Sequence, residues 1–228
     1  MTTGTTSEPR FWAIALMGPI AAGKGTQAEL LASELGLVHL ENSKIIEEKF
    51  ANEPNDPDVQ KAKEDYMAGR WIDPEILMKW IGGVMQDIAD KKLGIVMSSG
   101  FRTLYESREE INLFEKSYAK ENIKFFQISL SEEEAVKRSL GRRICKANRH
   151  PIPNFPEFKD LTACPQDGSE LVTRALDKPE LISKRYQEYL TRTVPSFDII
   201  KGRGYNIHEI NGEQSIEEVH RDILNKLF

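Results

Sequence analysis

A run of glycines and small residues around one lysine is the strongest chemical signal in this sequence. It reads Gly18-Pro-Ile-Ala-Ala-Gly23-Lys24-Gly25-Thr26. Glycines let the backbone turn sharply so that successive N–H groups point inward, and a helix that follows adds its positive N-terminal end. With the ammonium group of Lys24, the run predicts a cradle for a di- or triphosphate. The alternative is a glycine-rich connection without a ligand.

The segments on either side of this run are those that a phosphate-binding loop requires. Phe11–Met17 is apolar throughout, which is typical of a strand covered on both faces of a parallel sheet. From Lys24 to Leu35 the apolar residues recur at helical spacing, and Gly36 provides a stop. The sequence therefore predicts a buried strand, a tight loop and an amphipathic helix in succession.

The rest of the chain alternates between short apolar runs and helices with recognisable starts. Further strands are predicted at Val38–Leu40, Gly94–Met97, Ile123–Leu130 and Tyr205–Ile210. Helix starts are indicated by Asp56-Pro57 and Asp73-Pro74, and by capping-box spacing at Ser107 with Glu110, Ser131 with Glu134, Asp177 with Glu180 and Ser215 with Glu218. Strands that alternate with helices predict an α/β fold with a parallel sheet.

Two segments interrupt this alternation. Residues 41–73 are mostly helical in pattern and contain a Pro/Asn/Asp loop, whereas residues 144–170 are rich in Pro, Asn and Gly and hold both cysteines. We interpret both as insertions into one core, so the chain of 228 residues is predicted to be a single domain, 1–228.

Composition limits the classes of function. The net charge of −5 argues against general binding to nucleic acid or to anionic membranes, and no window is apolar enough for a membrane helix. Six basic residues nevertheless crowd the thirteen positions 137–149, which indicates a small polyanionic ligand. Only two cysteines are present, so we expect a protein of the reducing cytoplasm. A signal peptide at Phe11–Gly23 is the alternative, but the preceding MTTGTTSEPR has no cationic excess.

Several motifs together resemble one family. Gly23-Lys24-Gly25-Thr26-Gln27 is similar to the G-K-G-T-Q of the adenylate kinase loop, and the stretch ending in Gly100-Phe-Arg102-Thr103 resembles G-F-L-L-D-G-F-P-R-T. Arg138-Ser-Leu-Gly-Arg142-Arg143 resembles R-x-x-G-R-R, and the segment from Asp167 to Arg185 resembles the lid exit and the helix after it. The motifs occur in the family's order from residue 11 to 228.

The resemblance implies a fold and an activity. The fold would be a three-layer α/β P-loop core of five parallel strands, with an acceptor-binding helical insertion at 41–73 and a mobile lid at 142–176. The activity would be that of a nucleoside monophosphate kinase that uses ATP and Mg²⁺ to phosphorylate AMP, in a cytoplasmic monomer. Its partners would be nucleoside mono- and triphosphates.

The resemblance also implies which residues form the site. Catalytic roles would belong to Lys24, Arg102, Arg138, Arg142, Arg174 and Arg185. Nucleotide binding would involve Gly18, Ala21, Ala22, Gly23, Lys24, Gly25, Thr26, Gln27, Asn42, Arg102, Glu106, Arg138 and Asp177. Arginine suits phosphoryl transfer because its fork binds phosphate bidentately and stays charged near neutral pH. Arg138 and Arg142, four residues apart, are expected on one face of the helix that Ser131 caps.

Four residues depart from the family pattern. Ala21 replaces a loop glycine, and Ser98 stands where the family has an aspartate that orients magnesium-bound water. Glu47 stands where the family places an arginine on the acceptor's phosphate, so a like charge would repel there unless Lys44 or Lys49 substitutes.

The fourth departure, Glu106, lies where the family reads adenine with a glutamine. An ionised glutamate only accepts hydrogen bonds, so it suits the donor edge of guanine better than adenine. The alternative is that Glu106 points elsewhere and backbone groups select the base.

The two cysteines fall at the spacing of a lid metal site. Cys145-x-x-Asn148 and Cys164-x-x-Asp167 match the family's zinc motif with one poor ligand, and His150 could provide the fourth donor. The open alternatives are zinc held by Cys145, His150, Cys164 and Asp167, and a metal-free lid in which these residues form hydrogen bonds.

Two other functions remain open at this point. The acceptor could be GMP, UMP or CMP instead of AMP. A non-catalytic nucleotide-binding domain is also compatible with the changes at Ser98 and Glu47, although the retained arginines favour an enzyme.

Overall fold

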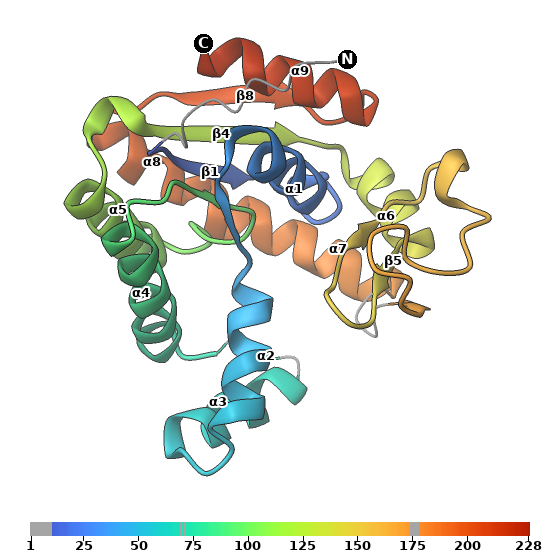
Figure 1. Ribbon diagram of the computed structural model, residues 1–228, viewed down its shortest axis with the longest axis horizontal. Coiled ribbons are helices and arrows are strands. Elements are labelled where there is room, and N and C mark those ends of the chain that lie inside the picture. Colours follow the sequence, from blue (N-terminus) through green and yellow to red (C-terminus); the bar gives the residue numbers. More distant parts are fainter. Residues whose placement is uncertain (1–10, 69, 71, 174–177) are drawn as a thin grey trace, which may run out of the picture.

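The fold is built on a sheet of five parallel strands in the order β2-β3-β1-β4-β8 (Figure 1). A computed structural model describes residues 11–68, 70, 72–173 and 178–228. The strands are β1 (Ala13–Met17), β2 (Val38–Leu40), β3 (Ile95–Met97), β4 (Ile123–Ser129) and β8 (Ile207–Asn211). The expected α/β class and five-stranded parallel sheet are confirmed.

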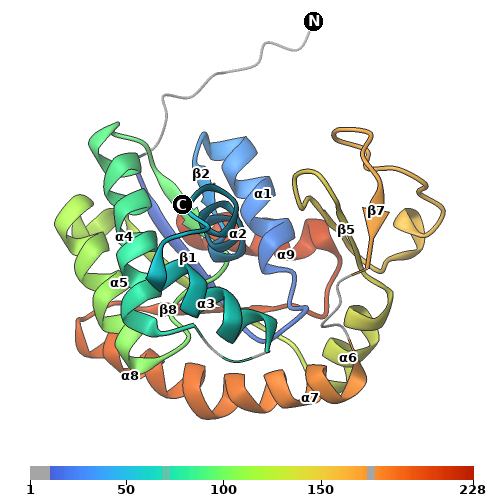
Figure 2. The ribbon, with the colours of Figure 1, turned by 90° about the horizontal axis from the view of Figure 1, so that it is seen from below.

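Alternate residues of the central strands enter two separate cores. Ala13, Ala15 and Met17 pack with α4 (Pro74–Asp90), α5 (Leu104–Ser117) and α8 (Val194–Gly202) on one face. Ile14 and Leu16 pack with α1 (Lys24–Leu35) and α9 (Ile216–Leu227) on the other. The sheet therefore lies between two helical layers, because side chains point to opposite faces at every second residue. Figures 1 and 2 show these layers from two directions.

Two segments leave this core (Figures 1 and 2). The first contains α2 (Asn42–Asn52) and α3 (Pro57–Met67), which extend below the sheet in Figure 1. The second follows α6 (Glu132–Gly141) and contains a small antiparallel sheet of β5 (Arg143–Cys145), β6 (Pro151–Ile152) and β7 (Leu171–Val172). We call β5, β6, β7 and their connections the small sheet.

The remaining elements connect these parts. They are the 3₁₀ turns η1 (Lys120–Asn122) and η2 (Pro156–Phe158), helix α7 (Pro179–Glu188) and the π-helical turn η3 (Tyr189–Thr193). Within the described residues, no helix is both long and apolar enough to span a bilayer.

Most helix starts follow the capping chemistry of the sequence. Asp56 and Asp73 cap α3 and α4, Ser131 caps α6, and Ser215 forms a complete capping box with Glu218. The predicted cap at Ser107 is wrong, because Thr103 caps α5 and both Ser107 and Glu110 are buried within that helix. The predicted cap at Asp177, a residue outside those described, is also wrong, because α7 begins at Pro179 with Lys178 as its N-cap residue.

Candidate active site

The glycine-rich loop is shaped by its close approach to the neighbouring strand. Gly18 has φ +144°, and a Cβ there would lie 2.3 Å from the carbonyl oxygen of Ile128 on β4. The Nζ atom of Lys24 donates to the carbonyls of Gly18 (2.9 Å) and Pro19 (2.6 Å). The side chain of Lys24 thus bonds back to the carbonyls of its own loop. It also lines the space where a phosphate would be held.

The residues that follow complete the turn into α1. Gly23, the N-cap residue, has φ +87°, and Ala21 adopts φ +60°, a left-handed conformation that is unfavourable for a residue with a Cβ. Gln27 is buried, where its Nε2 donates to the carbonyl of Ile216 (2.9 Å) and its Oε1 accepts from Nδ1 of His220 (3.1 Å). Gln27 therefore links the start of α1 to α9 by hydrogen bonds. These contacts help to fix the loop in which Ala21 has its unfavourable backbone conformation.

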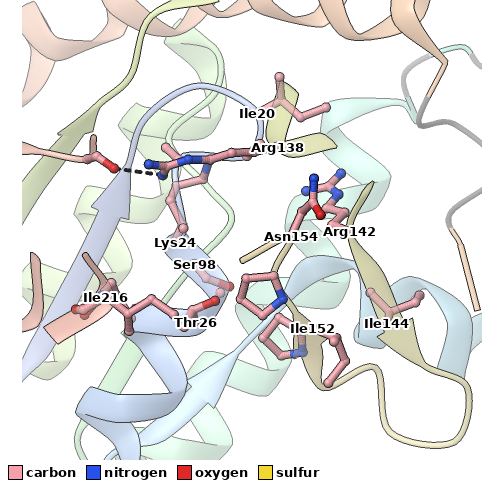
Figure 3. Close-up of a pocket in the computed structure, with 18 of the residues that line it drawn as sticks. Ile20, Lys24, Thr26, Ser98, Arg138, Arg142, Ile144, Ile152, Asn154 and Ile216 are labelled. Atoms are coloured by element: carbon pink, nitrogen blue, oxygen red, sulfur yellow. Dashed lines mark hydrogen bonds between the residues drawn. The ribbon is translucent and has the colours of Figure 1, made fainter. Parts of the chain in front are cut away.

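A cavity opens in front of this loop, and Figure 3 shows the side chains that face it. Its walls come from the loop, from the end of β3, from α6 and from the small sheet. Of the residues expected in the site, it is lined by Ala21, Ala22, Gly23, Lys24, Gly25, Thr26, Gln27, Arg102, Arg138, Arg142 and Arg185. With Arg143 and Arg149, which also line it, segments far apart in the sequence bring seven cationic side chains to one cavity.

Two hydrogen bonds and a ring contact hold the side chain of Arg138. Its Nε donates to Glu134 (2.8 Å), its Nη1 donates to the carbonyl of Gly212 (2.8 Å), and its Cζ lies 5.3 Å from the ring centroid of Phe155. These contacts leave the side chain only 13% exposed. The guanidinium is therefore preorganised beside the loop, as Figure 3 shows.

The other arginines approach from different elements. Arg142 was expected on the same helix as Arg138, but α6 ends at Gly141 and Arg142 is its C-cap residue in an extended conformation. It still lines the cavity, as do Arg102 before α5 and Arg185 on α7. Arg174 and Asp177 lie outside the described residues.

Two buried glutamates on α5 hold the backbone of the loop that carries Arg102. Glu110 accepts from the N–H of Phe101, and Glu106 accepts from the N–H of Arg102 (3.2 Å). Glu106 is 2% exposed and is not among the residues that line the cavity. Gly100 leaves room for this arrangement, because a Cβ there would lie 2.8 Å from Oε1 of Glu110.

Glu110→Gln is expected to stabilise the protein, increasingly so as the pH rises. Burial, and then the charge of Glu106, raise the pKa of Glu110 well above its ordinary value of 4.5. Above that value the unfolded chain ionises while the folded protein keeps the neutral form, so the wild-type free energy of unfolding falls as pH rises. Glutamine lacks this titration. Thermal unfolding from pH 4 to 8 should show a Tm gain of a few degrees at pH 8 that shrinks towards pH 4; a constant difference would contradict the expectation.

A histidine and a serine pair at the end of the strands beside the cradle. The Nε2 atom of His39 lies 2.7 Å from Oγ of Ser98, and burial lowers the pKa of His39 to about 4. A neutral imidazole and a hydroxyl thus lie where the resemblance implies an aspartate. Asn42, expected to bind nucleotide, is buried at the start of α2, where its N–H donates to Oγ of Ser99 (2.7 Å).

Glu47 does not stand as an unbalanced negative charge. Nη1 of Arg149, on the turn between β5 and β6, lies 2.6 Å from Oε1 of Glu47, and Nε of Arg149 lies 3.8 Å from Oε1 of Glu41. The suggested substitute Lys49 pairs instead with Glu53 (2.6 Å). The expected repulsion is therefore offset by an arginine from the small sheet.

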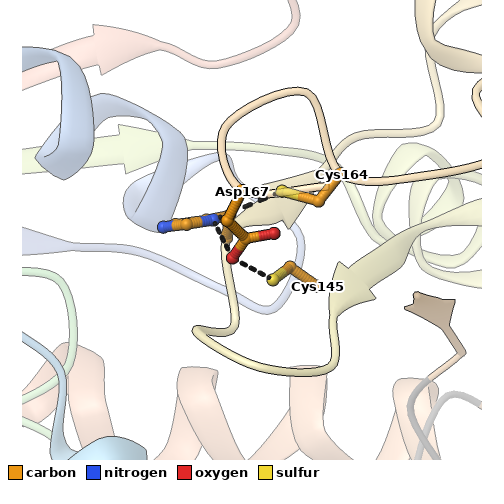
Figure 4. Close-up of side chains that lie close together, drawn as sticks. Cys145, Cys164 and Asp167 are labelled. Atoms are coloured by element: carbon orange, nitrogen blue, oxygen red, sulfur yellow. Dashed lines mark hydrogen bonds and ion pairs between the residues drawn. The ribbon is translucent and has the colours of Figure 1, made fainter. Parts of the chain in front are cut away.

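The two cysteines, His150 and Asp167 lie together in the small sheet (Figure 4). Their candidate ligand atoms all lie within 4.8 Å of one another. Sγ of Cys145 is 3.0 Å from Oδ2 of Asp167, and Nδ1 of His150 is 3.3 Å from both Sγ of Cys164 and Oδ2 of Asp167. Hydrogen bonds from Cys145, Asn148 and the Ser169 N–H hold the pKa of Asp167 well below its usual range.

Sequence reasoning did not identify several residues of the cavity wall. They are His39, Glu41, Ser99, Arg149, Asn154 and Phe155. A signal existed only for Arg149, which belongs to the cationic cluster at 137–149. The others are single polar or aromatic residues in segments whose positions depend on the whole fold.

Comparisons with known proteins find one matching family model and relatives that align over nearly the whole chain. The family model described as "AAA domain" matches residues 17–151. The adenylate kinase of Clostridioides difficile is 32% identical over 219 residues, which is 94% of this chain and 97% of the relative. The adenylate kinases of Caldicellulosiruptor saccharolyticus and Bacillus subtilis are 29% and 28% identical, over 93% and 94% of this chain respectively and 97% of each relative.

Proposed function

This chain belongs to the adenylate kinase family, and we propose that it transfers the terminal phosphoryl group of ATP to AMP. It is a nucleoside monophosphate kinase, a phosphotransferase that resembles the adenylate kinases with which it aligns over nearly its whole length. The observation that supports the proposal most is the cavity in which the Lys24 loop meets arginines from the Arg102 loop, α6 and α7. That arrangement places positively charged side chains from several elements around the space for a polyphosphate.

The chemistry asks for charge and position rather than for a general base. The acceptor is a phosphate oxygen that is already anionic at neutral pH, so no proton needs to be removed from it. Negative charge spreads over the transferring group, and fixed guanidinium groups stabilise that charge. We assign this role to Arg138 and Arg142, with Lys24 on the donor phosphates and Arg102 on the acceptor phosphate. By the resemblance, we assign Arg174 and Arg185 to the transferring group as well.

The residues present fit the phosphates of ATP and a magnesium ion. Loop residues Gly18 to Gln27 would surround the donor phosphates, since Gly18 has no room for a Cβ and the N-terminus of α1 faces the cavity. The hydroxyl groups of Thr26 and Ser98 and the carboxylate of Glu41 line the same space and would hold Mg²⁺ or its water. When bound, the ion neutralises charge on the phosphates.

The two segments outside the core take the roles implied by the family. We propose that residues 41–73, with Asn42, form the acceptor-binding insertion and that residues 142–176 form a lid. Lid closure would exclude water, because an open site would hydrolyse ATP instead of transferring its phosphoryl group. Contacts already join the lid to the core, since Nε2 of Gln166 lies 3.4 Å from Oε2 of Glu29 on α1.

The position of Glu106 bears on the choice of acceptor base. Its carboxyl group is buried beneath the Arg102 loop, where it accepts from the N–H of Arg102 (3.2 Å), and it does not line the cavity. Burial raises the pKa of Glu106, while the charge of Arg102 opposes that shift. We therefore infer that Glu106 supports the loop and that other groups select the base, so the proposal of AMP rests on the adenylate kinases with which the chain aligns.

Turnover with four acceptors tests the function. Purified protein is mixed with ATP, Mg²⁺ and one of AMP, GMP, CMP or UMP, and ADP formation is followed. We expect the fastest turnover with AMP. Faster use of GMP would keep the kinase and change the acceptor, whereas tight ATP binding without turnover of any acceptor would establish a nucleotide-binding domain without catalysis.

Cys145, His150, Cys164 and Asp167 form what we call the lid cluster. Their side chains fit zinc, and we propose that they bind it. Zinc–sulfur and zinc–nitrogen bond lengths imply donor–donor distances of roughly 3.3–3.8 Å in a tetrahedral site, close to the 3.3 Å between Nδ1 of His150 and Sγ of Cys164. Cys145, His150, Cys164 and Asp167 would hold the ion, whose bonds would cross-link the small sheet.

Metal analysis of protein purified without chelators is expected to give about one equivalent of zinc. Cys145→Ser should reduce that content at least tenfold, because the serine hydroxyl stays protonated and binds zinc poorly. The control is Lys146→Ala at the next residue, whose exposed side chain pairs with Glu170. Less than about a tenth of an equivalent in the wild type would reject a structural site.

A further inference from the structure

We propose that Arg149 of the lid binds the acceptor's phosphate in place of the arginine that α2 lacks, and that Glu47 positions it. The inference rests on the proposed function. It concerns Glu47, which stands where the resemblance implies an arginine on the acceptor's phosphate, so that a negative charge replaces a positive one. An acceptor phosphate needs cations there, and the structure brings one from a segment 102 residues away.

The contact between Glu47 and Arg149 places this cation. Glu47 lies on α2, where the family has its phosphate-binding arginine, and its Oε1 is 2.6 Å from Nη1 of Arg149. The guanidinium of Arg149 is thereby held next to the position that a family arginine would occupy. Glu41 lies on the same side, with its Oε1 3.8 Å from Nε. Two carboxylates from the start of the acceptor segment thus orient one guanidinium from the lid.

Arg149 also has an unused donor. Its side chain is 15% exposed and lines the cavity together with Lys24 and Arg102. Its Nε is buried and has no hydrogen-bond partner within the described residues. A buried N–H without a partner is rare because its desolvation is unfavourable, and a phosphate oxygen would satisfy it with a charge-assisted hydrogen bond.

The backbone at Arg149 is arranged to present this side chain. Arg149 adopts φ +60°, an unfavourable conformation for a residue with a Cβ that is often found at functional positions. Its N–H donates to the carbonyl of Cys145 (2.9 Å), and the N–H of Cys145 donates to the carbonyl of His150 (3.0 Å). The turn is thus fixed by the residues of the Cys/His/Asp cluster, so the lid cluster and the acceptor site are mechanically connected.

Paired binding measurements test the inference. Calorimetry would compare a nucleoside monophosphate, chosen as the best acceptor in the turnover assay (AMP if none turns over), with its nucleoside, which lacks the phosphate. Arg149→Ala is expected to weaken binding of the monophosphate about ten- to hundredfold and to leave binding of the nucleoside within about twofold. Arg149→Lys, which keeps the charge but loses the fork, should fall between wild type and Arg149→Ala.

Two further variants separate phosphate binding from a structural role. Lys146→Ala removes another cation of the same turn, one that pairs with exposed Glu170, and should leave both affinities unchanged. Glu47→Arg combined with Arg149→Ala restores an arginine to α2 and should recover at least half of the lost binding energy for the monophosphate.

Equal weakening of monophosphate and nucleoside by Arg149→Ala, or no weakening of either, would overturn the inference. These outcomes are distinct from failure of the proposed function, which would appear as absence of turnover by the wild type. Circular dichroism checks that each variant is folded, and the Arg149→Lys result alone decides if the alanine variant does not fold. In that case monophosphate affinity equal to wild type would reject recognition by the guanidinium fork.

Discussion

Lys24→Met is expected to reduce kcat/KM at least about a thousandfold while leaving the fold intact. Nζ of Lys24 donates to the carbonyls of Gly18 and Pro19 at the rim of the cradle, so the ammonium is already placed where phosphate charge would develop. Methionine retains the length and apolar character of the stem but removes the charge. Because the interaction with phosphate grows as charge accumulates during transfer, the loss should appear in kcat as well as in KM.

Steady-state kinetics of Lys24→Met and of the control Lys91→Met provide the measurement. Lys91 is exposed at the C-cap of α4 and does not line the cavity, so its substitution tests the general effect of losing one lysine. The control should retain wild-type activity, and both variants should unfold within a few degrees of wild type. Turnover by Lys24→Met within tenfold of wild type would contradict the assignment of the loop as the phosphate cradle.

Arg138→Ala is expected to reduce kcat about a hundred- to ten-thousandfold with a smaller change in the KM for ATP. Its guanidinium is fixed by Glu134, Gly212 and the ring of Phe155, so little reorganisation is needed when the transferring phosphoryl group becomes more negative. Alanine removes the charge and its orientation together. Arg138→Lys should recover only part of the loss, because an ammonium group cannot form the bidentate contact.

Lys137→Ala is the matched control for Arg138. Lys137 is the adjacent cation and pairs with the same carboxylate, since its Nζ lies 3.0 Å from Oε2 of Glu134, but its side chain is 74% exposed. An exposed ion pair of this kind contributes little to stability, so this variant should keep nearly full activity. Equal losses in the two variants would indicate that Glu134 or helix α6 is perturbed and that Arg138 has no specific role.

Local patterns predicted the elements of the fold well. The helix Lys24–Leu35 and the strand Val38–Leu40 were predicted with the bounds that the structure has, because helical spacing, a stop glycine and an apolar run are local signals. The interpretation of Glu110 as a capping residue was wrong because it relied on local spacing alone. The spacing from Ser107 is correct, but only the folded protein shows that this face of α5 lies against the loop of Phe101.

The site was predicted where it depends on motifs and missed where it depends on long-range contacts. Lys24, Arg102 and Arg138 line the cavity. Each lies in a motif that comes after a strand of the parallel sheet, in the connection to the next helix or on that helix. Arg149 and its partner Glu47 lie in two different segments outside the core, so their contact could not be inferred from spacing. The strain at Ala21, with φ +60°, likewise becomes visible only in the backbone.

Binding of a bisubstrate compound, two adenosines joined by five phosphates, tests the central claim most directly. The claim is that the Lys24 loop and the surrounding arginines hold two nucleotides with their phosphates end to end. Titration calorimetry should give one molecule bound per chain, at least about a hundredfold more tightly than AMP, because one linked ligand satisfies both halves of the site. That advantage should disappear in Lys24→Met and in Arg138→Ala. Wild-type binding no tighter than that of AMP, or tight binding unaffected by both substitutions, would contradict the account.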